Sequence, residues 1–334
     1  MDFQTASNSR IRAIALAIAN SATLGVTALA FVASHYGWSP YLELLSHFQL
    51  QYFVISAIAL VVLILSRRRS FIAIGLFCSA LLAVQIVPWY LPPLRLLPQP
   101  EANLRVLVSN LHDRNTQFDR VVSLVREENP DFAVFIEVNA RWAEQLDRLR
   151  DILPYQFSPD RVEKRGVAVY SKRPLLDPQL KQFDSHETAS IVSDLEISGQ
   201  RLSVIATHPM PPVKSWRFRL RNQHFDNLGD YVPTLTQPTL VLGDLNTTMW
   251  SPYYQRLVRR TGLENARRGF GILPSWPTRN NFNALPLFGA RLLSIPIDHC
   301  LLTPDIQAID VRTGPDIGSD HLPLLVDLLV SPRS

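Results

Sequence analysis

The chain has 334 residues, of which 47% are hydrophobic and only 19% are charged. This length suits about two domains, and this composition excludes a disordered or low-complexity chain. Two cysteines, Cys78 and Cys300, are too few for a disulfide scaffold or a cysteine-rich zinc module. The first hundred residues hold six of the 33 basic and two of the 29 acidic side chains, and therefore the whole net charge of +4. The neutral remainder lacks the positive charge expected of a protein that grips long nucleic acid.

Three N-terminal stretches contain no Asp, Glu, Lys or Arg: residues 13–42, 44–66 and 70–94. Each has an apolar core of about 20 residues, which is enough to cross a hydrocarbon layer of about 30 Å. A buried helix of a soluble core is the alternative for any one stretch, but three in succession favour the bilayer. We therefore predict a membrane anchor over residues 1–91, with spans near residues 11–32, 48–65 and 71–90.

The arginines that flank these spans predict their orientation. Arg10 and Arg12 precede the first span, and residues 67–69 are three arginines between the second and the third. If the first two spans form a hairpin, both groups lie on one side, which the positive-inside rule assigns to the cytoplasm. The C-terminal part is then periplasmic, in a multi-pass protein that suits a bacterial inner membrane. Alternatively, the first span is a signal peptide cleaved near residues 27–30, which leaves the C-terminal part outside as well.

A proline-rich linker over residues 92–101 follows the anchor, and its composition favours extended, semi-rigid backbone close to the membrane. Strand and helix patterns alternate in the second domain, residues 102–334. We predict helices at residues 118–128, 140–149 and 215–231, and strands at residues 103–109, 132–138, 166–171, 191–197, 201–207, 239–242, 297–302 and 322–330. Both parallel and hairpin-like connections are implied, so we expect a layered α/β sandwich.

Polar side chains stand directly after these apolar strands, where ligands and reacting groups commonly lie. Each one alone has a simpler explanation: an Asn or Asp can cap a turn, an Asp can pair with an arginine, and a histidine is more often structural. Their combination, with neither a serine elbow nor a thiolate nearby, indicates chemistry. The residues are Asn110, Glu137, His208, Asp244, Asn246, Asp298, Asp320 and His321.

The carboxylates among them predict a metal site. Glu137 follows five apolar residues, so its carboxylate needs a partner or a metal. Oxygen ligands such as Glu137 and Asp320 suit Mg²⁺ or Mn²⁺ rather than zinc. A divalent cation, an aspartate base and histidine donors together suit the attack of water on phosphorus.

Six motifs occur here in the order found in a known family. Four are Ser-Asn at 109–110, Phe-Ile-Glu at 135–137, Thr-His-Pro at 207–209 and Ile-Asp-His at 297–299. The others, Gly-Asp-Leu-Asn at 243–246 and Gly-Ser-Asp-His at 318–321, are together fairly specific. Over residues 103–329 the chain thus resembles the endonuclease/exonuclease/phosphatase superfamily, with the deoxyribonuclease-I-like fold. Residues 247–252 also resemble its bacterial membrane-anchored branch.

The resemblance implies a four-layer α/β sandwich, with two packed mixed sheets flanked by helices, and metal-dependent phosphoester hydrolysis. It implies that Glu137 is the principal metal ligand, assisted by Asn110, with Asp320 supporting the metal. Some nucleases of the family carry an acidic residue two positions after the strand-end Asn, where this chain has His112. The number of metal ions therefore stays open.

The resemblance also implies the roles of the remaining residues. Asp244 would orient or deprotonate the attacking water, and Asn246 would bind the transferring phosphoryl group. His321 would contact the phosphate, with Asp298 fixing its tautomer and orientation. His208 would be a second phosphate contact.

The substrate stays open between nucleic acid and a phospholipid headgroup, because members of this superfamily act on both. A basic stretch follows His208 closely and forms either a phosphate-recognition loop or the solvated face of a helix. It contains Lys214, Arg217, Arg219 and Arg221, with Trp216 and Phe218 between them. A non-catalytic, membrane-tethered binding module of the same fold is the alternative to an enzyme. The sequence implies the lipid bilayer as a partner, and no protein partner can be inferred from it.

Overall fold

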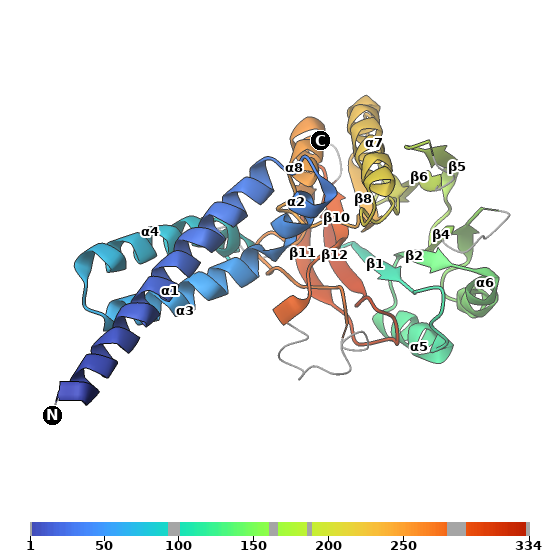
Figure 1. Cartoon of the computed structure of the whole chain (residues 1–334). Coiled ribbons are helices and arrows are strands. Elements are labelled where there is room, and N and C mark those ends of the chain that lie inside the picture. The colour runs from blue at the N-terminus through green and yellow to red at the C-terminus, as the bar shows by residue number, and fades with distance from the viewer. Residues whose placement is uncertain (1, 93–100, 160–165, 186–188, 279–291, 332–334) are drawn as a thin grey trace. The chain divides into compact units, whose positions relative to one another are not determined.

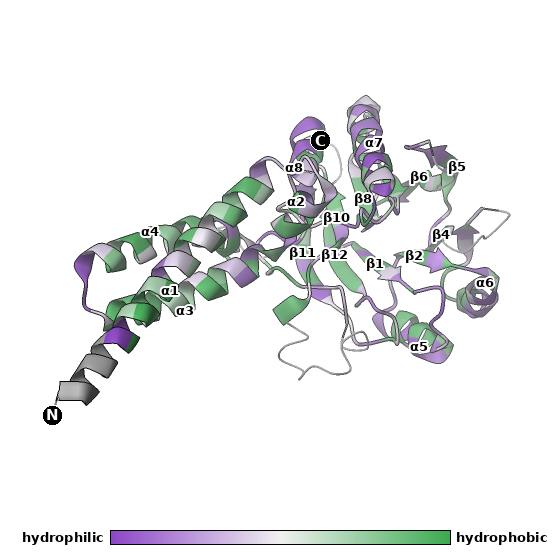
Figure 2. Ribbon diagram, viewed as in Figure 1, coloured by the Kyte–Doolittle hydropathy of each residue, from purple (hydrophilic) through white to green (hydrophobic). Residues whose placement is uncertain are grey.

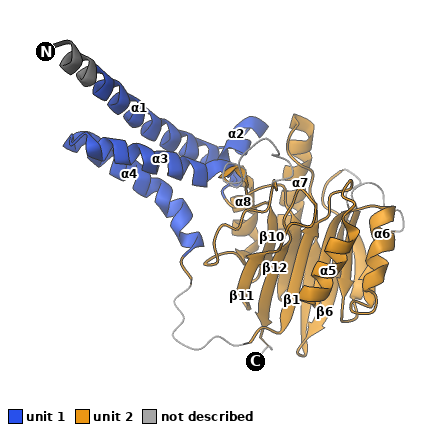
Figure 3. Cartoon of the chain, turned by 90° about the horizontal axis from the view of Figure 1, so that it is seen from below, with its two compact units in different colours: residues 1–90, 250–252 blue, residues 91–249, 253–334 orange. Residues whose placement is uncertain are grey.

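The computed structural model describes residues 2–92, 101–159, 166–185, 189–278 and 292–331. The chain divides into two compact units, one of residues 1–90 and 250–252 and the other of residues 91–249 and 253–334 (Figure 3). Most of the predicted linker, residues 93–100, lies outside the described residues.

The first unit is helical, and three of its segments are long and apolar enough to cross a membrane: Arg10–His35, Pro40–Leu65 and Arg69–Trp89. Large apolar side chains along them stay exposed, as in Ile18 and Val84, which suits surfaces that face lipid. Figure 2 shows the hydrophobic colouring that runs along these helices. The second segment begins earlier than predicted, because a short helix and a 3₁₀ turn precede its long helix. The elements are α1 (Asp2–His35), α2 (Pro40–Leu45), η1 (Ser46–Phe48), α3 (Gln49–Leu65), α4 (Arg69–Ile86) and η2 (Val87–Trp89).

The second unit contains two mixed sheets, as predicted, and each has six strands. The first has the order β11-β12-β1-β2-β4-β3 and the second β5-β6-β7-β8-β10-β9. Figure 1 labels most of these strands. The strands of the first sheet are β1 (Leu104–Asn110), β2 (Phe132–Val138), β3 (Tyr155–Phe157), β4 (Gly166–Ser171), β11 (Ile306–Thr313) and β12 (Leu324–Val330). Those of the second are β5 (Leu176–Gln182), β6 (Ala189–Ile197), β7 (Gln200–Ala206), β8 (Thr239–Asp244), β9 (Glu264–Asn265) and β10 (Asp298–Leu302).

The main core lies between the two sheets, because side chains alternate between the faces of each strand. Val106 and Val134 of the first sheet belong to the same buried cluster as Val204 and Leu240 of the second. The other face of the first sheet is covered by the helices α5 (Phe118–Glu128) and α6 (Ala140–Leu146). Leu107 of β1 packs in one cluster with side chains of both helices and of η3 (Asp147–Leu149), which follows α6.

Two further helices, α7 (Ser215–Tyr231) and α8 (Pro252–Thr261), lie side by side. The Phe218 ring packs edge-on against that of Tyr253, and Arg260 forms ion pairs with Asp226 and Asp230. His224 of α7 contacts the Thr207 hydroxyl just beyond β7, with 2.8 Å between Nε2 and Oγ1. These helices are therefore associated with the second sheet, and η4 (Val232–Thr234) follows α7.

The predicted elements are confirmed to within a few residues, whereas several others were not predicted: α2, α8, β3, β5, β9 and β11. The edge strands β5 and β11 bury few of their side chains, so they lack the apolar runs on which the prediction depended. The predicted end of α5 is confirmed: Asn129 adopts a left-handed φ of 45° and its N–H donates to Val125 O.

Glycine at position 243 is required for the second sheet. Gly243 has a φ of +151°, and a Cβ added there would lie 1.8 Å from the backbone oxygen of Thr207. We expect Gly243→Ala to push β7 and β8 apart and to lower the free energy of unfolding by about 3 kcal/mol or more, measured by urea denaturation of the full-length protein in detergent. In Gly199→Ala, where φ is +78° and no atom lies within 4 Å, the loss should be about 1 kcal/mol. Equal losses would contradict this steric explanation.

Candidate active site

The strand pairing brings polar strand ends to a shared region in each sheet. Asp244 and Asp298 are direct partners across the antiparallel pair β8 and β10. Strand β7 runs parallel to β8, with Ala206 opposite Leu242, so His208 follows on the side where Asp244 ends β8. In the first sheet β1 and β2 are parallel, with Asn110 opposite Ile136. Asn110 and Glu137 are therefore at neighbouring strand ends.

Two carboxylates hold His321 between them. Asp298 Oδ2 lies 2.9 Å from Nδ1 of His321, and Asp244 Oδ2 lies 3.7 Å from its Nε2. His208 approaches the same Asp244 oxygen, with 3.6 Å between Nε2 and Oδ2. All four side chains are buried. The structure thus joins four of the predicted residues in one cluster.

Burial and charge set the protonation of this cluster. Burial raises the pKa of Asp244 to about 7, and the neighbouring Asp298 charge adds to the rise, although His321 opposes it. Burial alone would lower the pKa of His321, but the charges of Asp298 and Asp244 outweigh it and raise the pKa to about 10. Burial also opposes ionisation of Asp298, yet contact with His321 keeps the pKa of Asp298 below its ordinary value. At neutral pH, Asp298 and His321 therefore form an ion pair.

Two asparagine residues orient Asp244. The amide Nδ2 of Asn110 donates to Asp244 Oδ2 at 3.2 Å, and the backbone N–H of Asn246 donates to Oδ1 at 2.8 Å. Asn246 has a left-handed φ of 51°, and its side-chain amide donates to Pro209 O. Both predicted asparagines thus belong to the same cluster.

Asp320 lies beside this cluster and contacts other partners. Its Oδ2 accepts a hydrogen bond from Trp276 Nε1 at 3.2 Å, and its backbone oxygen accepts one from Thr278 N–H. The preceding Ser319 donates its hydroxyl to Asn110 O at 2.7 Å. This bond ties the loop that carries Asp320 and His321 to the end of β1.

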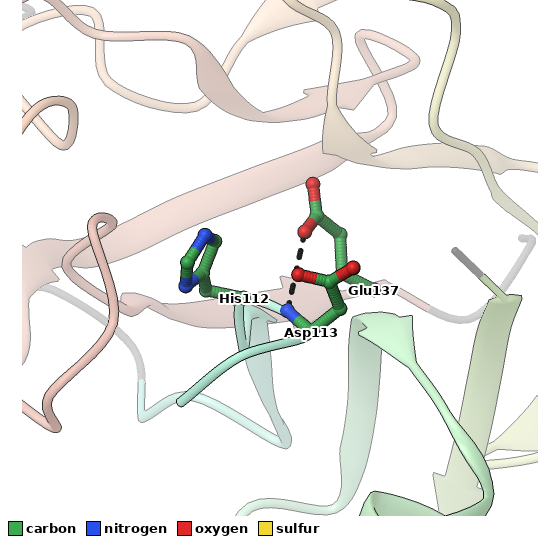
Figure 4. Close-up of side chains that lie close together, drawn as sticks. All are labelled: His112, Asp113 and Glu137. Atoms are coloured by element: carbon green, nitrogen blue, oxygen red, sulfur yellow. Dashed lines mark hydrogen bonds between the residues drawn. The ribbon is translucent and has the colours of Figure 1, made fainter. Parts of the chain in front are cut away.

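Glu137 belongs to a second cluster. The pairing of β2 with β4 shifts register between Ile136 and Val138, and Glu137 has a left-handed φ of 59°. Such a bulge re-aims a side chain. Ligand atoms of Glu137, His112 and Asp113 lie within 4.8 Å of one another, and Asp113 N–H donates to Glu137 Oε2 at 3.3 Å (Figure 4).

The basic stretch after His208 matches the solvated helix face only in part, because Lys214 and Arg219 are exposed whereas Arg221 is not. Arg221 is fully buried, with its guanidinium over the rings of Phe218, Phe225 and Tyr253. Phe218 is buried as well, so these two residues belong neither to an exposed recognition loop nor to a solvated helix face. Lys214 and Trp216 are exposed near the start of α7.

Three residues that the sequence analysis did not identify contact Asp298 or Asp320. Arg267 is fully buried and its Nη1 donates to the backbone oxygen of Asp298. The hydroxyl of Ser275 accepts a hydrogen bond from Asp298 N–H, and Trp276 contacts Asp320 as described above. All three lie in segments without a strand pattern, so the sequence carried no signal for them.

Comparison with known proteins identifies the family. The profile of the endonuclease/exonuclease/phosphatase family matches residues 102–321. No curated protein matches the chain significantly. Among solved structures, an endonuclease/exonuclease/phosphatase from Beutenbergia cavernae has a TM-score of 0.56 at 19% identity, covering 69% of this chain and 72% of its own.

Two further structures share this fold. An AP endonuclease from Archaeoglobus fulgidus has a TM-score of 0.52 at 17% identity, covering 67% of this chain and 98% of its own. The 3′ phosphatase NExo from Neisseria, solved with a product DNA hairpin, has a TM-score of 0.54 at 20% identity. The match covers 67% of this chain and 98% of the phosphatase chain. These identities establish a common fold, and the family match covers most of the second unit. The chain therefore belongs to the endonuclease/exonuclease/phosphatase family of phosphoester hydrolases.

Proposed function

We propose that this chain is a membrane-anchored, divalent-metal-dependent phosphodiesterase of nuclease type that acts outside the cytoplasm. The observation that carries the proposal is the buried network of Asp298, His321 and Asp244. It combines an ion pair with a carboxylate whose pKa is raised to about 7. Such a pair of opposed proton affinities is typical of acid–base catalysis.

Asp244 is the proposed base for the attacking water. A carboxylate with a pKa near 7 can accept a proton more effectively than one with an ordinary pKa and is still largely ionised above neutral pH. The N–H of Asn246 holds Oδ1, so Oδ2 is the oxygen that faces His208 and His321. This oxygen is the proposed acceptor of the water proton.

His321 and His208 are the proposed phosphate contacts. Because Asp298 holds Nδ1 of His321, its Nε2 is directed toward the Asp244 side of the cluster. A charged imidazole there can donate to a phosphoryl oxygen and stabilise the negative charge that develops on it. Asn246 is the proposed third donor, because its amide nitrogen carries a second N–H besides the one given to Pro209.

The half-buried Glu137 is the proposed principal metal ligand, with Asn110 and Asp320 assisting. Its donor set fits a hard cation such as Mg²⁺ or Mn²⁺, because carboxylate and amide oxygens are the preferred ligands. The buried Asp244, Asp298 and His321 also have ligand atoms within 4.8 Å of each other, but a protonated imidazole cannot bind a cation. When bound, the cation would neutralise phosphate charge and polarise the phosphoryl oxygen.

Nucleic acid is the proposed substrate class, because the Neisseria relative was solved with product DNA. A phospholipid headgroup is the second candidate, favoured by the three apolar segments that could place the same chain in a bilayer. A panel of plasmid DNA, single-stranded DNA, RNA, phospholipids and phosphomonoesters under identical metal conditions distinguishes them. Failure to hydrolyse any of them would favour the non-catalytic binding module instead.

Removal of the proposed base should abolish most turnover. We expect the full-length protein in detergent to hydrolyse bis-(p-nitrophenyl) phosphate with Mg²⁺ or Mn²⁺, and EDTA to stop the reaction. Asp244→Asn should lower kcat by about 10²-fold or more, the scale of a lost acid–base group. The matched control is Asp305→Asn, because Asp305 is exposed before β11 and its amide variant should keep full activity. Undiminished turnover by Asp244→Asn would remove Asp244 from the mechanism.

The ion pair of His321 predicts a pH-dependent contribution to stability. The folded-state pKa of about 10 lies above the ordinary 6.5, so the stabilisation is complete below pH 6.5 and is lost as the pH rises through 10. Breaking this buried pair with His321→Gln should lower the free energy of unfolding by about 3–5 kcal/mol at pH 6. The difference from the unmodified protein should narrow above pH 10. Urea titrations at pH 6 and above pH 10 measure this difference in the free energy of unfolding. An equal loss of stability at the two pH values would mean that His321 is neutral in the folded protein.

The arginine pattern predicts the side on which the C-terminus lies. Because Arg10, Arg12 and residues 67–69 are expected in the cytoplasm, alkaline phosphatase fused after Ser334 should be active in bacteria and a green fluorescent protein fusion dark. The opposite result would overturn this topology and leave the chemistry unaffected.

A further inference from the structure

His112 and Asp113 form the turn directly after β1 and have no role in the chemistry proposed above. Both are only half-buried, as is Glu137. Figure 4 shows the imidazole of His112 and the carboxylate of Asp113 beside that of Glu137. The three residues come from two neighbouring parallel strand ends, so the sheet itself brings them together.

The ligand atoms are spaced as one small cation requires. One atom from each of the three side chains lies within 4.8 Å of the other two. Around an ion with bonds of about 2.1 Å in octahedral geometry, ligand atoms are about 3.0 Å apart when adjacent and about 4.2 Å apart when opposite. Because 4.8 Å exceeds the larger of these spacings, the half-buried side chains would rotate slightly to bind the ion.

The backbone of the turn is fixed, so the side chains project from a rigid base. His112 N–H donates to Asn110 Oδ1 at 3.0 Å, and its carbonyl accepts from Trp142 Nε1 at 3.4 Å. The carbonyl of Asp113 accepts from Asn139 Nδ2 at 2.8 Å. Trp142 is fully buried at the start of α6, which anchors the turn to the helical layer. Preorganisation of this kind reduces the entropy lost on binding.

The charge of the cluster is uncompensated within the described part of the chain. Asp113 and Glu137 are close together, and no ion pair to a basic side chain is formed by either of them in the ranges described. Two neighbouring carboxylates repel each other, and a bound cation offsets this repulsion. The charge thus favours an occupant that is a cation.

An imidazole nitrogen among the ligands determines which cation. Mg²⁺ prefers oxygen ligands, whereas imidazole suits transition metals, and Mn²⁺ accepts carboxylates as well. We propose that His112, Asp113 and Glu137 bind one divalent transition-metal ion and select Mn²⁺ over Mg²⁺. This inference rests on the proposed function in one respect, because Glu137 is a metal ligand in both.

Direct binding measurements on the full-length protein in detergent test the inference. Electron paramagnetic resonance of added Mn²⁺ gives its Kd, and displacement by Mg²⁺ gives the Mg²⁺ Kd. We expect His112→Ala to raise the Kd for Mn²⁺ at least about 10-fold, the scale of a lost metal-binding interaction. His112→Asp, which replaces the nitrogen ligand by oxygen, should lower the ratio of the Mg²⁺ Kd to the Mn²⁺ Kd. Asp113→Asn should weaken the binding of both metals. Asp305→Asn is the matched control, and it should leave the binding of both unchanged.

Two results would overturn the inference. An unchanged Mn²⁺ Kd in His112→Ala would remove His112 from the site, and an unchanged metal ratio in His112→Asp would remove the selectivity. Either result leaves the proposed function standing if Asp244→Asn still abolishes hydrolysis. Conversely, tight Mn²⁺ binding that depends on His112 in a protein without hydrolytic activity would support the site and refute the proposed function.

Discussion

The buried ion pair between Asp298 and His321 is the interaction on which the candidate active site depends. A carboxylate with no exposed surface is unfavourable unless it is paired and hydrogen-bonded, and Asp298 has both an imidazole partner and a backbone position fixed by Arg267. The pair fixes the ring of His321, and the charge of Asp298 adds to the rise in the pKa of Asp244. The pair therefore keeps His321 charged, whereas burial is the main cause of the raised pKa of Asp244.

The gathering of these residues could be predicted because it follows from strand geometry. Asn110, His208 and Asp244 each come directly after or at the end of an apolar strand, and an apolar run that stops at a polar residue is visible in the sequence. Parallel strands then place such residues at a common edge. The pairing of Asp298 with Asp244 across β10 and β8 follows from the same pattern once the sheet order is known.

The details that depend on backbone irregularity could not be predicted. The bulge that turns Glu137 toward His112 has no signature in an otherwise regular apolar strand. His112 likewise adopts a left-handed φ of 58°, and its carbonyl accepts a hydrogen bond from Trp142, 30 residues away. Arg221 shows a different limit: charge alone suggested an exposed residue, whereas a surrounding of aromatic rings compensates its burial.

The side-chain amide of Asn110 connects the two clusters, and its chemistry explains why an amide is suited to that position. Its oxygen accepts the N–H of His112, and its nitrogen donates to Asp244 Oδ2. A carboxylate there could accept the first hydrogen bond but could not donate the second, and it would place another negative charge beside Asp244. An apolar side chain would leave both partners unsatisfied in a buried place. A neutral group that donates and accepts at once therefore joins the turn of His112 and Asp113 to the cluster around Asp244 without altering the charge of either.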